Sequence, residues 1–531
     1  MTYLYKSVGC VCCYADHLRL ESTDVLHHSC TSAISCSMMM KGWLGGYSPL
    51  DVDVKDEQED SSLISTWMRI VKSYFLLEER GTSIEVEFRA GLTSFLTMSY
   101  ILLVNPQILG LLGIPREQVV VSTALSAAIS SILSGLFSNL PFGVASGIGL
   151  SIYLTYGLVQ SGRLDLPESF TACFLSSVVL GLIAAIGATE HIMKIIPRSV
   201  KLGIITGMGL LVALVGMTSV NIVVSNPQTI VGLGDIDTLA PFFVLVGLCF
   251  IGSLVYHRVQ GGILIGILTL SLIWWILNGD YPTSFVSFPT ITMGPSDFIQ
   301  FSTFSTDSVP ALLAFLCVGL FDISGVILGM SELAGLKKPE NDKVEGSKYV
   351  FLSASAGSMF GAAFGCTNNI VYVESAAGIT EGGKTGLTSI FVGIFFLLSI
   401  ILAPLMACIP EVATAPVLML IGAMMMGQAK QVDWNDMMEA VPAFLTMIMM
   451  PFTFSITNGI LFGFVSAILF YIMTGTAWSD LKILYNRRDD PDFAEFNIRN
   501  NGLSFESSPN REIPRIPSLI LDKKRADSIS L

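Results

Sequence analysis

Long apolar runs recur along most of this chain, separated by glycine, proline or clusters of charged residues. Several runs, such as Ala240 to Tyr256 and Gly261 to Leu277, contain no charged residue. A helix of about 20 apolar residues crosses the hydrocarbon core of a bilayer. The pattern therefore predicts about fourteen membrane spans, centred near residues 100, 128, 151, 179, 208, 248, 269, 320, 356, 372, 395, 420, 444 and 465.

The two ends of the chain differ from the apolar middle. Residues 1–80 and 477–531 are polar and weakly patterned, so we expect them to be disordered segments on the cytoplasmic side of the membrane. Between them we expect a first repeat of seven spans at residues 81–278, an extracytoplasmic loop at 279–308 and a second seven-span repeat at 309–476.

Composition agrees with a chain embedded in a lipid bilayer. Of its 531 residues 52% are hydrophobic and 13% charged, whereas soluble domains carry roughly a quarter charged residues. A soluble enzyme is thereby excluded, and the fold class is an all-α polytopic membrane protein. The net charge of -13 gathers in the acidic stretch from Asp51 to Glu79 and in the C-terminal tail, so it indicates no particular partner, and nucleic acid is not expected.

The loops between spans differ in basic residues. Loops on the side of the termini hold ten Lys and Arg residues, and the opposite loops hold two, Arg116 and Arg163. Because cytoplasmic loops carry the excess of positive charge, both termini are predicted to be cytoplasmic. The ten are Lys194, Arg198, Lys201, Arg258, Lys337, Lys338, Lys343, Lys348, Lys384 and Lys430.

Short sequence matches recur in the same order in both halves of the apolar region. They are Pro141-Phe142-Gly143 with Ala363-Phe364-Gly365, Ile196-Pro197 with Ile409-Pro410, and Gly262 to Gly266 with Gly459 to Gly463. Two repeats of seven spans have opposite orientations, because seven is odd. The sequence thus predicts the inverted repeats of secondary transporters, with core and gate parts and a substrate site near the midplane.

The third and tenth spans are the predicted interruptions. Residues 141–151 open with proline and contain three glycines, which disfavour a continuous helix. Residues 365–374 open with glycine, two amides and β-branched residues. We expect each to be a short extended piece followed by a half-helix that faces the substrate site.

Two acidic residues, Asp322 in the eighth span and Glu374 in the tenth, are the strongest candidates for function. An ionised side chain at the centre of a span costs about 2.5 to 3.5 kcal/mol on insertion scales, so an acidic residue there usually has a functional role. No Lys, Arg or His lies within either segment to pair with them. The structural alternative is that each caps a helix or pairs with a polar neighbour.

Carboxylates suit a nucleobase, because a purine presents ring and exocyclic N–H donors along one edge. A partly desolvated acid also binds and releases a proton near neutral pH. Glu374 is therefore the predicted base-binding acceptor, and Asp322 the predicted binding or proton-coupling partner, with the division between them left open. Other candidate substrate-binding residues are Ser151, Phe321, Asn368, Asn369 and Val373, for which helix capping, packing or satisfaction of the broken backbone are the alternatives.

Cysteine positions give no further site. Five of the ten cysteines fall in predicted spans, and Cys10, Cys12, Cys13, Cys30 and Cys36 share the N-terminal segment with three histidines. Their spacing fits no zinc template. We expect no metal, no cofactor and no disulfide framework.

Three long motifs resemble one transporter family, the AzgA-like adenine, guanine and hypoxanthine permeases. They are Arg89-Ala90-Gly91-Leu92-Thr93-Ser94-Phe95-Leu96-Thr97-Met98-Ser99-Tyr100-Ile101-Leu102-Leu103-Val104-Asn105-Pro106, then Leu320-Phe321-Asp322-Ile323-Ser324-Gly325, then Tyr372-Val373-Glu374-Ser375-Ala376-Ala377-Gly378-Ile379. The resemblance covers roughly residues 75 to 475 and implies a fourteen-span fold with core and gate domains, shared with uracil, xanthine and sulfate-type carriers. It also implies proton-coupled purine uptake and, by analogy with the fold, a homodimer.

Plant members of that family, described as azaguanine-resistance permeases, are linked to cytokinins, which are N6-substituted adenines. The family's third span usually reads Gly-Met-Gly-x-Asn, and this chain has Gly147-Ile148-Gly149-Leu150-Ser151. Serine is shorter than asparagine and leaves room, so a bulkier adenine derivative becomes a candidate substrate. Plasma membrane is the expected location, with endoplasmic reticulum as the alternative.

Three other readings stay open at this point. A carrier of the same fold for uracil, xanthine or an anion is one, although two midplane acids oppose an anion. An intramembrane enzyme using Asp322 and Glu374 as an acid pair is another, but the Gly-x-Gly-Asp signature of aspartyl proteases is absent. A channel or receptor is the third, and two isolated acids do not supply the continuous polar lining of a pore.

Overall fold

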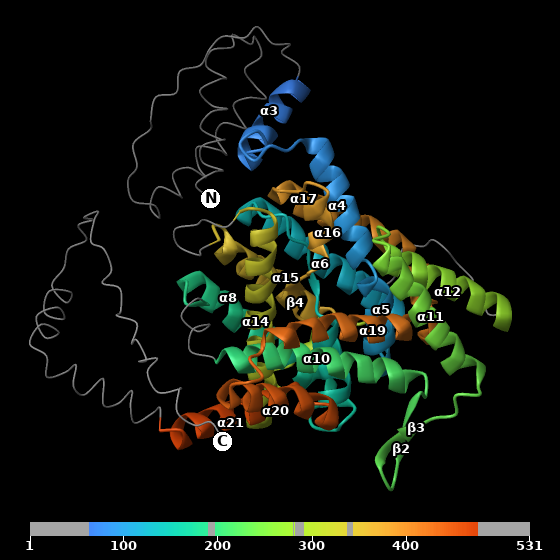
Figure 1. The fold of residues 1–531 in the computed structure, drawn as a ribbon. Coiled ribbons are helices and arrows are strands. Elements are labelled where there is room, and N and C mark those ends of the chain that lie inside the picture. Colours follow the sequence, from blue (N-terminus) through green and yellow to red (C-terminus); the bar gives the residue numbers. More distant parts are fainter. Residues whose placement is uncertain (1–62, 190–196, 280, 282–290, 337–343, 476–531) are drawn as a thin grey trace, which may run out of the picture. The chain divides into compact units, whose positions relative to one another are not determined.

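The computed structural model describes residues 63–189, 197–279, 281, 291–336 and 344–475. The described residues up to 468 belong to one compact unit, and residues 469–475, the end of the last helix, belong to a second. The described chain is mostly helical (Figure 1). Its N-terminal cysteines and most of the C-terminal tail lie outside the described residues.

The first half contains long apolar helices, one short strand and a hairpin. Its elements are α3 (Leu63–Phe75), α4 (Ile84–Met98), α5 (Ile101–Leu109), η1 (Gly110–Leu112), α6 (Arg116–Ser138), β1 (Val144–Ser146), α7 (Ile148–Ile152), η2 (Tyr153–Val159), α8 (Leu166–Ile186), α10 (Arg198–Ser219), β2 (Val223–Asn226), β3 (Ile230–Leu233), α11 (Leu239–Tyr256) and α12 (Gly262–Asn278).

The second half repeats this order without the hairpin. Its elements are α13 (Pro295–Phe298), η3 (Phe301–Thr303), η4 (Thr306–Ser308), α14 (Val309–Leu333), α15 (Ser347–Ala363), β4 (Asn369–Val371), α16 (Ser375–Thr380), α17 (Gly386–Ser399), η5 (Ile400–Leu402), α18 (Ala403–Ala407), α19 (Glu411–Met425), η6 (Met426–Gln431), α20 (Met437–Thr453) and α21 (Ile456–Met473).

Every predicted span coincides with an element of the structure. Within the described residues, nine helices are long and apolar enough to cross a membrane. Three shorter apolar helices, Ile148–Val159, Gly262–Asn278 and Met437–Thr453, fall at three more predicted positions. Helix α15 and the β4–α16 segment fall at the remaining two. The count of fourteen crossings itself stays a prediction, as do the boundaries of the two repeats.

The helices pack in two groups. The core group contains α4 to α8 and α14 to α18, in which α6 packs against α17 and α15 packs against α8. The gate group contains α10 to α12 and α19 to α21, in which α10 packs against α20 and α19 packs against α11. In the core group, α6 and α17 of one contact correspond to α15 and α8 of the other. In the gate group, α10 and α20 correspond in the same way to α19 and α11. This correspondence is the mark of the predicted inverted repeat.

The repeated glycines bring neighbouring helices of the gate group together. A Cβ on Gly266 would lie 2.5 Å from Ile251 of α11, and a Cβ on Gly463 would lie 2.0 Å from Thr446 of α20. Small residues let membrane helices approach closely and gain van der Waals contact. The match found in sequence therefore has one packing role in both halves.

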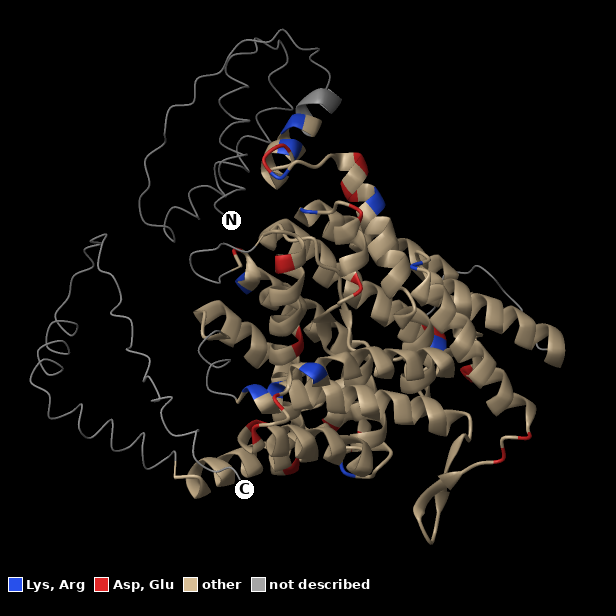
Figure 2. Cartoon of the chain, viewed as in Figure 1, with Lys and Arg blue, Asp and Glu red and all other residues tan. Residues whose placement is uncertain are grey.

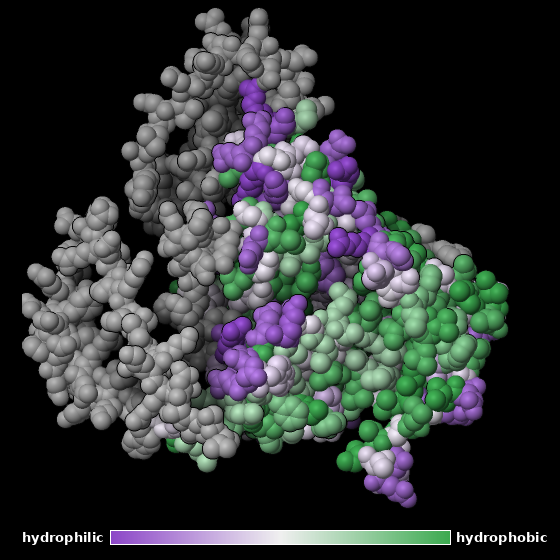
Figure 3. All heavy atoms as spheres, viewed as in Figure 1, coloured by the Kyte–Doolittle hydropathy of each residue, from purple (hydrophilic) through white to green (hydrophobic). Residues whose placement is uncertain are grey.

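Charged and apolar residues are segregated as a membrane protein requires. Lys and Arg lie mostly near helix ends, and most of the helical surface carries neither charge (Figure 2). On the face drawn in Figure 3, hydrophobic residues cover the region of α11 and α12, whereas hydrophilic residues gather near α3 and the start of α4. This distribution supports spans that are surrounded by lipid.

Residues 63–80 require a correction, since the sequence placed them in a disordered segment. They form α3 and a turn, in which Phe75 and Leu77 are buried in a small cluster with Leu387. Arg80 donates to the backbone oxygens of Asn139 and Lys384 at 2.6 and 2.7 Å. This short apolar pattern was not recognised in the sequence because it directly follows an acidic stretch.

Candidate functional site

Two short strands cross at the centre of the core group, as predicted for the third and tenth spans. Strand β1 pairs antiparallel with β4 in the register Val144 to Val371, Ala145 to Ile370 and Ser146 to Asn369. The backbone N–H of Tyr372 extends the ladder by donating to Gly143 O at 3.0 Å. Since lipid offers no hydrogen bonds, each interrupted span satisfies its extended backbone with the other.

Glu374 follows β4 and occupies the N-cap position of α16. Its Oε1 accepts a hydrogen bond of 2.7 Å from the hydroxyl of Tyr100, which lies at the junction of α4 and α5. Its backbone oxygen accepts a bond of 3.3 Å from Thr97 Oγ1. Among the described residues the Tyr100 bond is the only hydrogen bond from another side chain to this carboxylate.

Asp322 lies in the middle of α14, and its side chain is buried with 7% of its area exposed. Helix α14 packs against both β4 and α16. No hydrogen bond or ion pair to the Asp322 carboxylate occurs within the part of the chain that the structure describes. A buried carboxylate without a partner is costly, which favours a ligand or a proton as its counterpart.

Tyr372 lies between β4 and Glu374. Its hydroxyl donates to Ser146 O at 2.6 Å, and its ring centroid lies 6.3 Å from that of Tyr100. Helix α14, which carries Asp322, packs against β4 and α16, the two elements that flank Glu374. The elements that carry the two acids therefore meet beside the pair of short strands.

Ser151 is buried in a polar network beneath the strands. Its hydroxyl donates to Asn105 Oδ1 at 2.8 Å and lies 2.7 Å from Thr367 Oγ1. Ser146 Oγ lies 2.8 Å from the same Thr367 hydroxyl. The hydroxyl of Ser151 is thus engaged by protein partners, and an effect on substrate has to pass through this network.

Asn368 and Asn369 also have protein partners. Asn368 Oδ1 accepts from Cys173 Sγ at 2.5 Å, and its Nδ2 donates to Ser176 Oγ at 2.9 Å. Asn369 Nδ2 donates to Ser130 Oγ at 2.6 Å and to Ser126 Oγ at 2.8 Å. These side-chain bonds tie the broken tenth segment to α8 and α6, and the substrate contacts predicted for the two asparagines stay predictions.

Phe321 and Val373 differ in exposure. Phe321 is 2% exposed and belongs to the large apolar core cluster, whereas Val373 is 53% exposed and immediately precedes Glu374. The substrate contacts predicted for these residues, and for Ser151, stay predictions.

Tyr100 and Tyr372 were not singled out from sequence, although both lie inside the quoted motifs. Tyr100 follows Ser99, and Tyr372 precedes Glu374 by two residues, which was the available signal. Tyrosine within a span is common near membrane interfaces, so the pattern alone did not show that two tyrosines face the acids.

The arrangement offers acceptors without a fixed cation. The described residues contain no group of three or more His, Cys, Asp and Glu that could hold a metal. A cavity of about 320 Å³ lies elsewhere, between α4, α12 and α17, and its walls are almost wholly apolar. The acids instead form a polar site suited to a neutral ligand with several N–H donors, and one that repels anions.

Comparisons with known proteins give one family. A model described as "Permease family" (Xan_ur_permease) matches residues 86–462. The adenine permease AdeP of Escherichia coli (strain K12) is 35% identical over 407 residues, which cover 76% of this chain and 91% of that protein. The guanine/hypoxanthine permease PbuO of Bacillus subtilis (strain 168) is 34% identical over 401 residues, covering 74% and 92%.

Among solved structures, the transmembrane domain of the cyanobacterial bicarbonate transporter BicA superposes with a TM-score of 0.54. Its sequence is 14% identical, and the match covers 72% of this chain and 97% of that one. This likeness confirms the predicted fold with its core and gate groups.

Proposed function

The chain belongs to this permease family, and from that membership we propose that it is a proton-coupled carrier of purine nucleobases. Relatives named as adenine and guanine/hypoxanthine permeases support nucleobases as the substrate class. Membership of a transporter family also argues against the acid-pair enzyme considered from sequence. The named relatives favour purines over the uracil, xanthine and anion alternatives.

One observation of the structure carries the proposal. Glu374 and Asp322 come from two different spans, and α14, which carries Asp322, packs against β4 and α16 on either side of Glu374. Within the described residues Asp322 has no hydrogen-bond donor, and Tyr100 is the one other side chain that donates to the Glu374 carboxylate. A purine supplies such donors along one edge, and a hydrogen bond to a charged group contributes about 1.5 to 3 kcal/mol. Binding of a neutral base removes the cost of leaving these acceptors unpaired.

Proton coupling is the second part of the proposal. Glu374 already accepts from Tyr100, whereas Asp322 has no hydrogen-bond donor in the described chain. A carboxylate that is buried and unpaired is the easier one to neutralise by protonation. We therefore assign proton binding chiefly to Asp322 and substrate binding chiefly to Glu374, which divides the roles left open by the sequence.

Substrate range is the third part. The side chain at position 151 is the short Ser151, and its network reaches Thr367, two residues before β4. We propose that the short side chain, through this network, widens the site enough for an N6 substituent, so cytokinins of the zeatin type are included as substrates. The carrier would act as a homodimer in the plasma membrane, or alternatively in the endoplasmic reticulum, with cytoplasmic termini.

The test is uptake of radiolabelled adenine by a yeast strain lacking its own purine carriers and expressing this chain. Guanine, hypoxanthine and trans-zeatin serve as unlabelled competitors, and a protonophore is added in a parallel series. Saturable uptake that falls with protonophore supports the proposal. Membrane-resident protein that takes up no purine would refute the substrate class, and uptake insensitive to protonophore would refute the coupling.

A further inference from the structure

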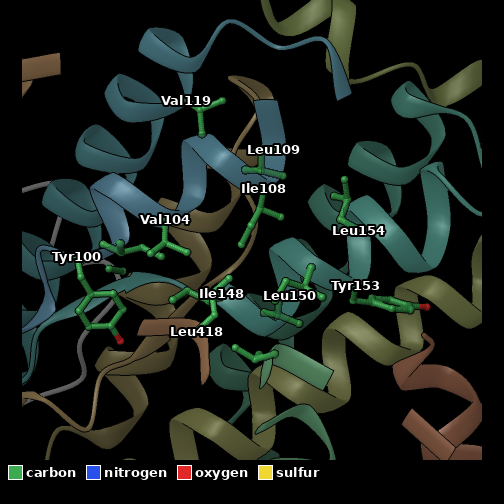
Figure 4. Close-up of a cluster of buried hydrophobic side chains, with 14 of the residues drawn as sticks. Tyr100, Val104, Ile108, Leu109, Val119, Ile148, Leu150, Tyr153, Leu154 and Leu418 are labelled. Atoms are coloured by element: carbon green, nitrogen blue, oxygen red, sulfur yellow. The ribbon is translucent and has the colours of Figure 1, made fainter. Parts of the chain in front are cut away.

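Tyr100 is the residue that holds the substrate-binding acid. Its side chain is 2% exposed, and it lies at one edge of the cluster of buried apolar residues that includes Val104 and Ile148 (Figure 4). Its ring packs in this cluster, and its hydroxyl donates to Glu374 Oε1 at 2.7 Å. A buried hydroxyl is costly without a partner, so packing and hydrogen bond together specify one orientation of the ring.

Helix α4 and its junction with α5 fix Glu374 at two points. Thr97 Oγ1 donates to the backbone oxygen of Glu374 at 3.3 Å, and Tyr100, three residues later, donates to its carboxylate. Residues three apart lie on the same face of a helix. One surface of the first span therefore positions both the backbone and the side chain of an acid that follows 274 residues later in the chain.

A glutamate side chain has three rotatable bonds before its carboxylate, and holding it in one rotamer before the ligand arrives removes an entropic cost of binding. The Tyr100 bond occupies Oε1, and within the described chain no other side chain donates to the carboxylate. The hydroxyl of Tyr100 thereby restricts the rotamers of the Glu374 carboxylate before a ligand binds. Asp322 has no such donor in the described residues, so this preorganisation is particular to Glu374.

We propose that Tyr100 is a positioning residue for substrate recognition, which acts through Glu374 by orienting its carboxylate toward the N–H edge of a purine. This inference rests on the proposed function, and it adds a residue of the first span to a site otherwise formed by the eighth and tenth. Tyr100 itself need not contact the purine.

The test uses the full-length protein and the variant Tyr100→Phe, which keeps the ring and its packing and removes only the hydroxyl. The KM for adenine uptake and the Kd of purified protein for adenine are expected to rise about tenfold or more, the factor that loss of one hydrogen bond to a charged group produces. The maximal rate per molecule in the membrane should stay within about twofold, because the hydroxyl orders the site before binding.

Tyr74→Phe is the matched control. Its hydroxyl also donates to a single acceptor, Leu136 O at 2.5 Å, but α3 lies away from the acids. This variant should keep the KM and the Kd of the wild type.

Glu374→Asp supplies the test of mechanism. The shorter side chain keeps its charge and moves away from Tyr100, so adding Tyr100→Phe to this variant should change the Kd by less than about twofold. A purely structural role of Tyr100 would instead lower affinity, yield and melting temperature by the same amount in both backgrounds.

The outcomes separate the two proposals. Wild-type protein that binds adenine, with a Tyr100→Phe variant of equal KM and Kd, overturns the positioning role and leaves the proposed function standing. Wild-type protein that binds neither adenine, guanine nor hypoxanthine overturns both. A raised KM that is equally large in the Glu374→Asp background overturns action through Glu374.

Discussion

Glu87 accepts a hydrogen bond from the hydroxyl of Thr388 at 2.5 Å, and the same carboxylate accepts the backbone N–H groups of Thr388 at 3.2 Å and Lys384 at 3.0 Å. Glu87 belongs to the first turn of α4 and is fully buried, and Thr388 belongs to the first turn of α17. A carboxylate is favoured at a helix N-terminus, where N–H groups lack partners. This contact joins the first and eleventh predicted spans without touching the site.

Replacing the Glu87 carboxylate should destabilise the protein and leave its affinity for substrate unchanged. Glu87→Gln turns an amide N–H toward the N–H donors of α17. We expect the free energy of unfolding to fall by about 2 kcal/mol or more, since a buried unsatisfied donor costs about 1 to 3 kcal/mol. Thermal unfolding of purified protein measures the change. Glu85→Gln, at an exposed position in the same turn, should leave the melting temperature nearly unchanged, and an equal loss in both variants would contradict the capping role.

The substrate acid should be indispensable. Glu374→Gln replaces one acceptor oxygen by a donor. Its amide oxygen can still accept from Tyr100, but its N–H group then opposes the N–H edge of a purine. Uptake should fall below one tenth of the wild-type rate with normal amounts of protein in the membrane. Normal uptake by this variant would remove Glu374 from the site.

The second acid should separate binding from coupling. Asp322→Asn keeps the shape of the side chain and cannot bind or release a proton. We expect uptake by this variant to become equilibrative and insensitive to protonophore, with adenine binding retained within about tenfold. Concentrative uptake that still falls with protonophore would place proton binding on another group.

Position 151 should influence the choice between plain and substituted purines. Ser151→Asn adds a longer side chain to a buried network that already engages Asn105 and Thr367. We expect trans-zeatin to lose potency as a competitor of adenine uptake by about tenfold or more, with the KM for adenine less affected. Ser161→Asn, at an exposed position after η2, is the control, and an unchanged competition profile in Ser151→Asn would exclude a role of this network in substrate range.

An ion pair between the two helix groups should affect rate more than stability. Arg116 at the start of α6 lies 3.2 Å from Glu411 at the start of α19, and each side chain is 42% exposed. Pairs this exposed contribute about 0 to 1 kcal/mol. If transport moves the core group against the gate group, this pair breaks in each cycle. Arg116→Glu is then expected to change the maximal uptake rate, and the exchange Arg116→Glu with Glu411→Arg to restore it. A double variant as impaired as the single one would show that the pair itself is not limiting.

Much of the fold could be predicted from the apolar runs and from the glycine, proline and charged residues that end them. Pro197 and Pro410 end up at equivalent N-caps of α10 and α19, and the interrupted segments pair as β1 and β4. The hairpin of β2 and β3 was not expected, because its residues lie in a loop without a long apolar run. Helix α3 was missed for a related reason, since its apolar positions follow an acidic stretch.

The site could be predicted only in part, for a physical reason. Asp322 and Glu374 stand out because a charge in lipid is costly. The bond from Tyr100 to Glu374 joins residues 274 positions apart, and no local pattern encodes such a contact. The same holds for Asn369, whose serine partners come from α6 and α15.

The strand crossing also constrains how this protein is made. Within the described residues β1 pairs with β4 alone, more than two hundred residues later in the chain, so the first half enters the membrane before its partner strand has been synthesised. Unpaired backbone N–H and C=O groups in hydrocarbon cost several kcal/mol each. The third segment must therefore stay hydrated or shielded until the second half arrives. The two halves then complete each other in one late step of biogenesis, and neither half expressed alone would present a substrate site.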